Sequence, residues 1–212
     1  MSVPSLVRRF QVVNPELADK YFNQGKSVMF IGPHYGNHEW GKIIGLQMQH
    51  PLVVLYSTFS NPYVDQYLIR ARVKYHIELV PVQKILRAFM ERKNKPYGFI
   101  LGVDQRPFDL NNALWVRFLN QDTPCHQGYE QIARKFDMPV VYVDIQVVKR
   151  GYYKFRTILL TEHPTTLPEG AIVKAFMKQI QMTIQARPEY WLWSHKRWKL
   201  KKPEGIEVES LD

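Results

Sequence analysis

Short apolar runs that alternate with helical segments restrict the fold of this chain more than any other feature of its sequence. Residues 27–32 (SVMFIG) form an apolar run that leads into Pro-His, which is typical of a buried parallel strand opening into a loop. Further strands are expected at 52–56, 77–82 and 97–103, with helices between them at 37–49, 62–75 and 83–93. Because strands and helices alternate, the sequence predicts an α/β fold with a mostly parallel central sheet flanked by helices.

The rest of the chain is expected to add two helices and a hairpin, at 127–136, 169–186, and 140–148 paired with 152–160. No internal repeat or low-complexity linker divides the sequence. We therefore expect residues 1–203 to form one domain and residues 204–212 to form a loose acidic tail.

The composition suggests a globular protein with an anionic partner. Of 212 residues, 45% are apolar, and 29 Lys and Arg face 19 Asp and Glu, which leaves a formal charge of +10. This charge favours nucleic acid, phospholipid head groups, lipid phosphates or an acidic carrier protein, and does not choose among them. The single cysteine, Cys125, excludes an internal disulfide and a cysteine-based metal cluster, and is compatible with a reducing compartment.

Several other classes of protein do not fit this sequence. No run approaches the roughly 20 apolar residues of a membrane-spanning helix, and the N-terminus lacks the layout of a signal peptide, so we expect a soluble or peripheral chain. The seven histidines show no spacing typical of zinc, and a glycine-rich phosphate loop is missing. We expect no metal and no nucleotide hydrolysis.

Candidate catalytic residues lie in the segment 32–41, GPHYGNHEWG. His34 directly follows a predicted strand, and Glu39 falls in the first turn of the next predicted helix, so both side chains can face one pocket. A histidine whose second ring nitrogen is held by a carboxylate can take a proton from a hydroxyl that attacks an acyl thioester. Glu39 is the candidate for that carboxylate, and the backbone N–H groups of Gly36 and Asn37 are candidate oxyanion donors.

Each of these assignments has a plainer alternative. A His and a Glu five residues apart are common by chance, and most such pairs are surface or capping residues. His38 competes as the base, but one position further along we expect it to point elsewhere. Cys125 and His126 could form a thiol nucleophile and its base, yet adjacent side chains diverge, so we interpret Cys125 as a small residue at a helix start.

Five blocks in order give the chain a specific resemblance. They are NPELADKYFNQGKSVMFIGPHYGNHEWG, LYSTFSNPYVDQYLIRAR, LGVDQRP, WVRFLNQDTPCHQGYEQIARKFDMPVVYV and PEYWLWSHKRWK. Together they resemble the lipid A biosynthesis (lauroyl/myristoyl) acyltransferase branch of the lysophospholipid acyltransferase superfamily, over residues 14–199. The hallmark of that superfamily is a His, four residues and an acidic residue, which His34 and Glu39 match.

The resemblance implies a fold like that of glycerol-3-phosphate acyltransferase and catalysis by a His34–Glu39 dyad. It places Asp104 and Gln105 in the site, with Asp104 organising it. Arg106 could contact an acceptor phosphate or carboxylate, or could belong to a loop with its own caps and ion pairs.

The resemblance also implies the substrates and the location. The donor would be an acyl thioester on acyl carrier protein or coenzyme A, without a further cofactor, and the acceptor a hydroxyl or amine of a membrane lipid or lipid A precursor. We expect acyl carrier protein as a partner, no nucleic acid, and a peripheral position at the cytoplasmic face of the bacterial inner membrane.

Two departures from the family pattern leave an alternative open. Ser57 stands where many relatives have an arginine, which Arg70 or Arg72 could replace. The resemblance begins close to the catalytic strand, so we expect a truncated or naturally short form without a membrane anchor. The alternative is a catalytically inactive module on the same fold that binds lipid or nucleic acid.

The run WLWSHKRWKLKK at 191–202 interleaves aromatic and basic residues. It would suit a membrane interface or a nucleic-acid surface. Because the run resembles a family block, we expect Trp191 and Trp193 to pack against the domain, with the lysines solvated.

Overall fold

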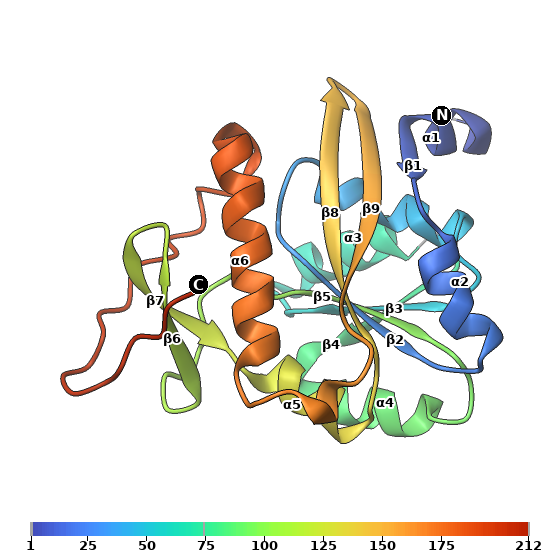
Figure 1. Ribbon diagram of the computed structural model, residues 1–212. Coiled ribbons are helices and arrows are strands. Elements are labelled where there is room, and N and C mark those ends of the chain that lie inside the picture. Colours follow the sequence, from blue (N-terminus) through green and yellow to red (C-terminus); the bar gives the residue numbers. More distant parts are fainter. Residues whose placement is uncertain (1, 74, 212) are drawn as a thin grey trace.

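The computed structural model describes residues 2–73 and 75–211, and a seven-stranded sheet lies at its centre (Figure 1). The strand order is β1-β9-β8-β2-β5-β3-β4, and all neighbours are parallel except the β8–β9 hairpin. The strands are β1 Phe10–Val12, β2 Val28–Gly32, β3 Leu52–Tyr56, β4 Ile77–Pro81, β5 Gly98–Gly102, β8 Val140–Lys149 and β9 Tyr152–Thr161. The predicted α/β fold with a mostly parallel sheet is confirmed.

Helices connect and cover these strands. The α-helices are α1 Val3–Arg9, α2 Glu16–Asn23, α3 Pro62–Arg72, α4 Ile85–Arg92, α5 Gly128–Lys135 and α6 Ala171–Ala186, and the 3₁₀ segments are η1 His38–Leu46, η2 Val82–Lys84, η3 Pro164–Thr166 and η4 Pro188–Tyr190. Asn61 starts α3, because its side chain accepts hydrogen bonds from the N–H groups of Tyr63 and Val64 and Pro62 occupies the first turn. No helix among the residues described is long and apolar enough to cross a membrane.

The central strand β2 is buried on both faces. Its apolar residues Val28, Met29, Phe30 and Ile31 are almost wholly inaccessible to solvent, since β5 and β8 flank the strand and helices cover the sheet. This burial explains why an uninterrupted apolar run marks the strand in the sequence.

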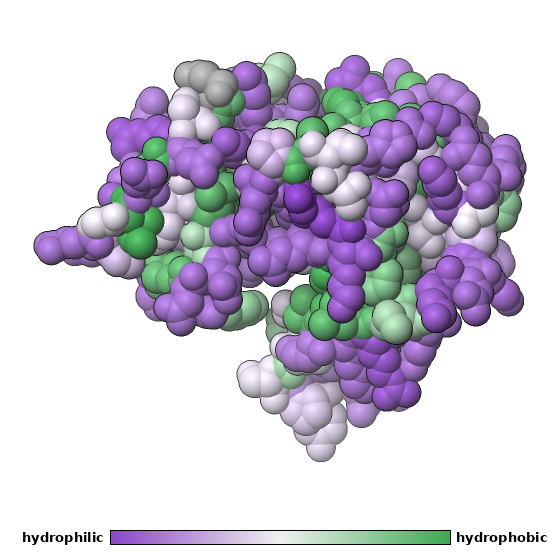
Figure 2. Space-filling model, turned by 60° about the horizontal axis from the view of Figure 1, so that its bottom comes forward, coloured by the Kyte–Doolittle hydropathy of each residue, from purple (hydrophilic) through white to green (hydrophobic). Residues whose placement is uncertain are grey.

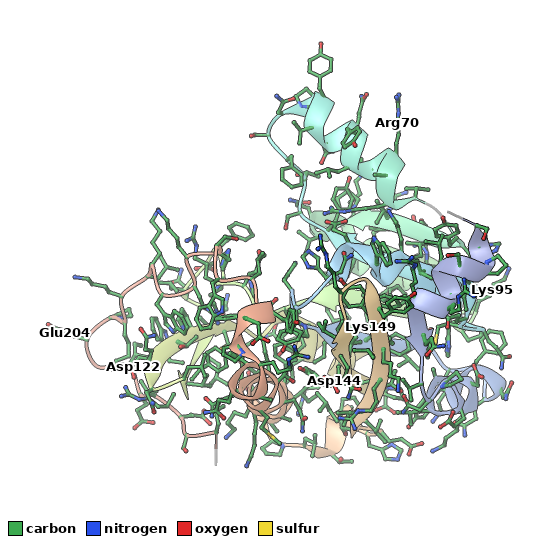
Figure 3. The ribbon with its side chains drawn as sticks, turned by 90° about the horizontal axis from the view of Figure 1, so that it is seen from above. Arg70, Lys95, Asp122, Asp144, Lys149 and Glu204 are labelled. Atoms are coloured by element: carbon green, nitrogen blue, oxygen red, sulfur yellow. The ribbon has the colours of Figure 1, made fainter. Side chains whose placement is uncertain are left out.

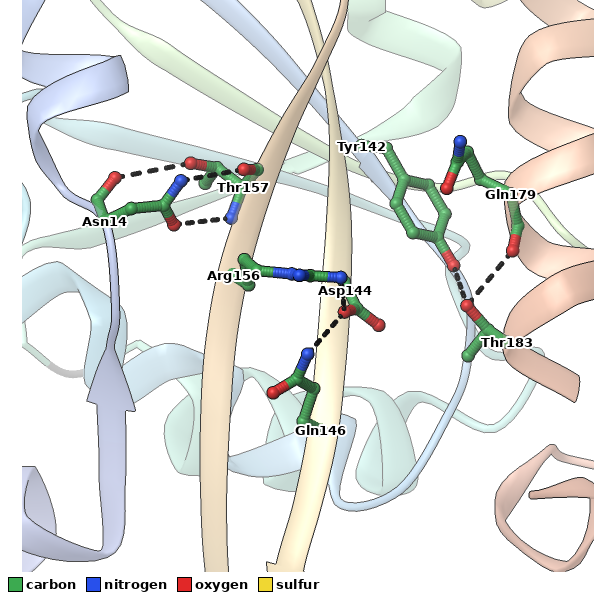
Figure 4. Close-up of polar contacts among 8 residues, drawn as sticks. All are labelled: Asn14, Tyr142, Asp144, Gln146, Arg156, Thr157, Gln179 and Thr183. Carbon is green, nitrogen blue, oxygen red and sulfur yellow. Dashed lines mark hydrogen bonds and ion pairs between the residues drawn. The ribbon is translucent and has the colours of Figure 1, made fainter. Parts of the chain in front are cut away.

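Polar pairs join the periphery to the sheet (Figure 4). The Asn14 side chain donates to the Thr157 carbonyl (2.8 Å) and accepts from the Thr157 N–H (2.9 Å), which fixes the N-terminal segment beside β9. Tyr142 on β8 hydrogen-bonds Thr183 of α6 (3.0 Å). The N-terminal segment that contains β1 therefore packs on the sheet and supplies its edge strand.

The segment after β2 differs from the expected helix at 37–49, because η1 is a 3₁₀ helix over His38–Leu46. Gly41 and Gly45 lower its α-helical propensity, and the N-cap residue Asn37 makes no side-chain capping bond. A Cβ atom on Gly45 would lie 2.0 Å from the Tyr75 carbonyl oxygen, so only glycine permits this close contact.

A small hairpin, β6 Ala113–Phe118 with β7 Gln121–His126, stands apart from the main sheet and was not expected. It turns at Leu119 and Asn120, which both have positive φ (48° and 62°), as in the two-residue turns that suit strand twist. Cys125 lies within β7 and is buried, so its interpretation as a helix-start residue is wrong. The acidic end, expected to be loose, pairs with this hairpin at Glu209, which also forms an ion pair with Lys174.

Glu130 connects α5 to the start of α6, and we predict that it is important for stability. Its buried carboxylate accepts from the N–H groups of Gly170 (2.8 Å) and Val173 (3.1 Å). Glu130→Ala leaves both donors unsatisfied and should lower the free energy of unfolding by about 2–4 kcal/mol. Glu130→Gln keeps one acceptor oxygen, so its loss of unfolding free energy should be roughly half as large. Equal losses for the two variants in urea unfolding would contradict the capping role.

Candidate active site

Strand register brings His34 and Asp104 together. Strands β2 and β5 are parallel with Gly32 opposite Gly102, so the residues two positions beyond each strand end lie side by side. His34 Nδ1–H donates to Asp104 Oδ1 (2.6 Å), and the His34 backbone N–H donates to Oδ2 (3.0 Å). The site therefore lies at the carboxyl ends of the central strands, where ligands of open α/β sheets bind.

Asp104 is a buried carboxylate that is fully engaged. Besides its two bonds to His34, it accepts from the indole N–H of Trp191 (2.9 Å) and is 2% exposed. Burial opposes ionisation, but the hydrogen bonds and charge of His34, together with the Trp191 bond, keep the pKa of Asp104 below its usual value. Asp104 thus stays charged beside the imidazole.

The Asp104 bond determines the chemistry of His34. It places the proton on Nδ1, so the Nε2 lone pair remains available at the cleft. Burial lowers the pKa of His34, yet the hydrogen bond and the charge of Asp104 outweigh it, and the net pKa lies above the ordinary 6.5. A histidine in this state can act as a general base, because its charged form is stabilised.

Gly102 is required for the position of the His34 ring. A Cβ atom at residue 102 would lie 2.6 Å from His34 Cε1 and 3.1 Å from Nε2. Any larger residue there would displace the imidazole from Asp104.

Glu39 makes a different contact from the one expected. Instead of His34, it binds Arg72 of α3, whose Nε donates to Glu39 Oε2 (3.1 Å) and whose Nη2 donates to Oε1. Asp104 already holds His34 Nδ1, and the guanidinium offers a bidentate charged partner. The Arg72 bond lowers the pKa of Glu39. The orienting bond predicted for Glu39 is therefore made by Asp104.

His38 lies at the same cleft, so the expectation that it points elsewhere is wrong. Gly36, with φ 56°, turns the chain so that the His38 ring packs edge-on against His34, with 5.1 Å between ring centroids. Burial and the nearby charge of His34 lower the pKa of His38.

An apolar cleft extends from these polar residues across the sheet, with a volume of about 440 Å³. Strand residues from β3, β4, β5, β8 and β9 form its apolar surface: Val54, Leu55, Ile77, Leu79, Ile100, Val143, Ile145 and Phe155. Its polar end is formed by His34, His38, Glu39, Lys42, Arg72 and Gln105. Such a space suits a ligand with a long apolar part and a reactive polar end.

Of the other predicted site residues, Gln105 lines this cleft, whereas Asn37, Arg70 and Arg106 do not. Arg70 is exposed on α3 and points away from the sheet (Figure 3). Arg106 belongs to a loop contact, since its backbone N–H donates to His195 Nε2 (3.1 Å) and its guanidinium donates to the Lys196 carbonyl (3.2 Å). The Gly36 N–H donates to the Tyr190 carbonyl (2.9 Å), so it is already engaged and is no free oxyanion donor.

The C-terminal aromatic segment completes the site, a role that the sequence did not reveal. The Leu192 N–H donates to the His34 carbonyl (3.1 Å), and Tyr35 forms a β-bridge with Trp191. Trp191 is buried as expected, whereas Trp193 is half-exposed while contacting Trp191 edge-on. The WLW run was the sequence signal for this segment. However, Asp104, the residue to which the Trp191 indole bonds, lies 87 residues away in the sequence.

Thiol catalysis finds no support in the site. Cys125 is 2% exposed, and burial raises its pKa to about 11, so it is an inert packing residue. Within residues 2–73 and 75–211, no three His, Cys, Asp or Glu side chains are grouped so that they could hold a metal ion.

Comparison with family models matches residues 1–200 to the bacterial lipid A biosynthesis acyltransferases. A search of the curated proteins finds no match. The matched region contains the β2–β5 strand pair, His34, Asp104, Glu39, Trp191 and the residues of the cleft. The chain belongs to the bacterial lipid A biosynthesis acyltransferase family and is an acyltransferase.

Proposed function

We propose that the protein transfers a fatty acyl group from an acyl thioester to a hydroxyl of a lipid A precursor, with His34 as general base. The observation that carries this proposal is the His34 Nδ1–Asp104 bond (2.6 Å) at the polar end of an apolar cleft. Asp104 is proposed as the orienting carboxylate, in place of a direct Glu39–His34 contact.

The proposed reaction proceeds without an acyl-enzyme. His34 Nε2 takes the proton of the acceptor hydroxyl while its oxygen attacks the thioester carbonyl carbon. The tetrahedral intermediate then expels the thiolate, which receives the proton from the His34 imidazolium. Asp104 stabilises the positive charge that His34 carries between the two proton transfers.

The oxyanion of the intermediate requires a donor other than Gly36. Gln105 lines the cleft directly after Asp104, and its side-chain amide can donate an N–H. His38 is a second donor, since its lowered pKa favours the neutral imidazole, which retains one N–H. We assign Gln105 to this role because its position next to Asp104 links it to the β5 strand end.

The donor is proposed to be acyl carrier protein or coenzyme A carrying the acyl chain, which would lie along the apolar surface of the cleft. A net charge of +10 favours association with an acidic carrier protein and with anionic lipid. Association with both of these partners fits a protein that works at the cytoplasmic face of the inner membrane.

Arg72 is proposed to bind a phosphate of the acceptor. It lines the cleft, and Glu39 holds its Nε and Nη2 at the polar end, so Nη1 is the group proposed to contact the phosphate. Since Ser57 stands where relatives often have an arginine, Arg72 supplies the cation from the next helix. Glu39 would then act through Arg72, as a positioning residue.

The test of the proposed function is acyl transfer from labelled acyl carrier protein, and separately from acyl coenzyme A, to a lipid A precursor dispersed in detergent. His34→Ala should lower the rate about a thousandfold or more, because the base is lost. His163→Ala, which changes an exposed histidine, is the matched control. Comparable transfer by the His34 and His163 variants would refute the base assignment, and no transfer by the unmodified chain from either donor would favour an inactive binding module.

Steady-state kinetics should separate the roles of Arg72 and Glu39. Arg72→Gln is expected to raise KM for a phosphorylated acceptor roughly tenfold with kcat nearly retained, because a charge-assisted contact is lost. Glu39→Gln should change KM in the same direction and less, and Arg70→Gln, on the same helix, should change neither. A fall in kcat confined to Glu39→Gln would show instead that Glu39 acts directly on the chemistry.

A further inference from the structure

The helix α3 and the loop before it expose apolar side chains to solvent. None of the 11 residues of α3 is buried. Tyr63 is 83% exposed and Tyr67 is 72% exposed, and three further apolar residues are also exposed at 59–73: Phe59, Val64 and Val73. Figure 3 shows α3 standing clear of the sheet, and in Figure 2 a lobe projects from the lower edge of the molecule next to hydrophobic surface. We call residues 59–73 the α3 lobe, of which the structure describes every residue.

The α3 lobe lines an exposed edge of the cleft, which we call the cleft mouth. Phe59, before the helix, and Arg72, in its last turn, both line the cleft. The exposed aromatic side chains therefore lie on the same short segment as the residues that a lipid would pass on its way to His34.

The chemistry of the α3 lobe fits the head-group region of a bilayer. Tyrosine has an apolar ring with a polar tip, and it is enriched where membranes meet water. Arg70 adds an exposed cation, and the one acidic residue of α3, Asp65, accepts a hydrogen bond from the Phe59 N–H (2.9 Å). The charge of the chain, +10, also favours an anionic surface.

We propose that the α3 lobe docks on the anionic surface of a lipid bilayer, with Tyr63 and Tyr67 at head-group depth and the cleft mouth facing the membrane. This inference rests on the proposed function, because it says how the same site receives a lipid substrate. A second copy of the chain fits less well, since a stable interface needs roughly 800 Å² on each partner and a symmetric contact would bring Arg70 towards its own copy.

Site-specific fluorescence can test this contact, because the single cysteine is buried. We would label Tyr67→Cys with an environment-sensitive dye, and label Met182→Cys on α6, which is 58% exposed, as the matched control. With vesicles of equal parts phosphatidylglycerol and phosphatidylcholine, emission at position 67 should rise several-fold and shift to the blue, while position 182 should not respond. The response should weaken with added salt and with phosphatidylcholine alone.

Vesicle sedimentation gives a second measurement. Tyr63→Gln with Tyr67→Gln should weaken binding about tenfold, which corresponds to partial loss of two aromatic contacts. Met182→Gln should bind like the unmodified chain. The rate of acyl transfer in detergent should be the same for the unmodified chain, the double tyrosine variant and Met182→Gln, since neither tyrosine lines the cleft.

Three outcomes would overturn the docking proposal. They are equal responses at positions 67 and 182, no response at 67 with anionic vesicles, and a response at 67 that follows protein concentration without vesicles, which would show contact between copies. Vesicle binding through position 67 without acyl transfer in detergent would support docking and contradict the proposed function, so the two failures are distinguishable.

Discussion

The pairing of β2 with β5 is the constraint on which the site depends. It aligns Gly32 with Gly102, so that His34 and Asp104 meet beyond the strand ends. Three further features stabilise that meeting: the Trp191 indole bond to Asp104, the Leu192 N–H bond to the His34 carbonyl, and the absence of a Cβ at Gly102. The geometry of His34 and Asp104 is thus a consequence of sheet register and of the contacts made by Trp191 and Leu192.

The cleft has an apolar part and a polar end. Apolar strand residues line one part of it, while charged and imidazole side chains line the polar end. Glu39 and Arg72 form an ion pair at this end, which connects η1 with α3. Lys42 of η1 also donates to the Ala71 carbonyl of α3 (2.8 Å), so these two polar contacts join α3 to η1 at this end of the cleft.

Sequence patterns predicted the fold well, because the burial of a strand or helix is reflected in the residue types along that segment. The apolar runs at 27–32 and 52–56 and the Asn61-Pro62 helix start identify their elements without any knowledge of the tertiary structure. Sequence patterns failed where contacts between residues far apart in the sequence determine the geometry. Glu39 was a natural partner for His34 along the chain, but Asp104, 70 residues away, is placed on the imidazole by strand pairing. Likewise, nothing local indicates that Trp191 would bond to Asp104, or that Gly45 of η1 would lie against the Tyr75 carbonyl.

The most direct measurement of the central claim is ¹⁵N NMR of the His34 ring as a function of pH. We predict a neutral ring protonated on Nδ1 and a pKa above the ordinary 6.5, with a fall in this pKa in Asp104→Asn because burial would then dominate. A ring protonated on Nε2, with a pKa at or below 6.5 that Asp104→Asn leaves unchanged, would contradict it.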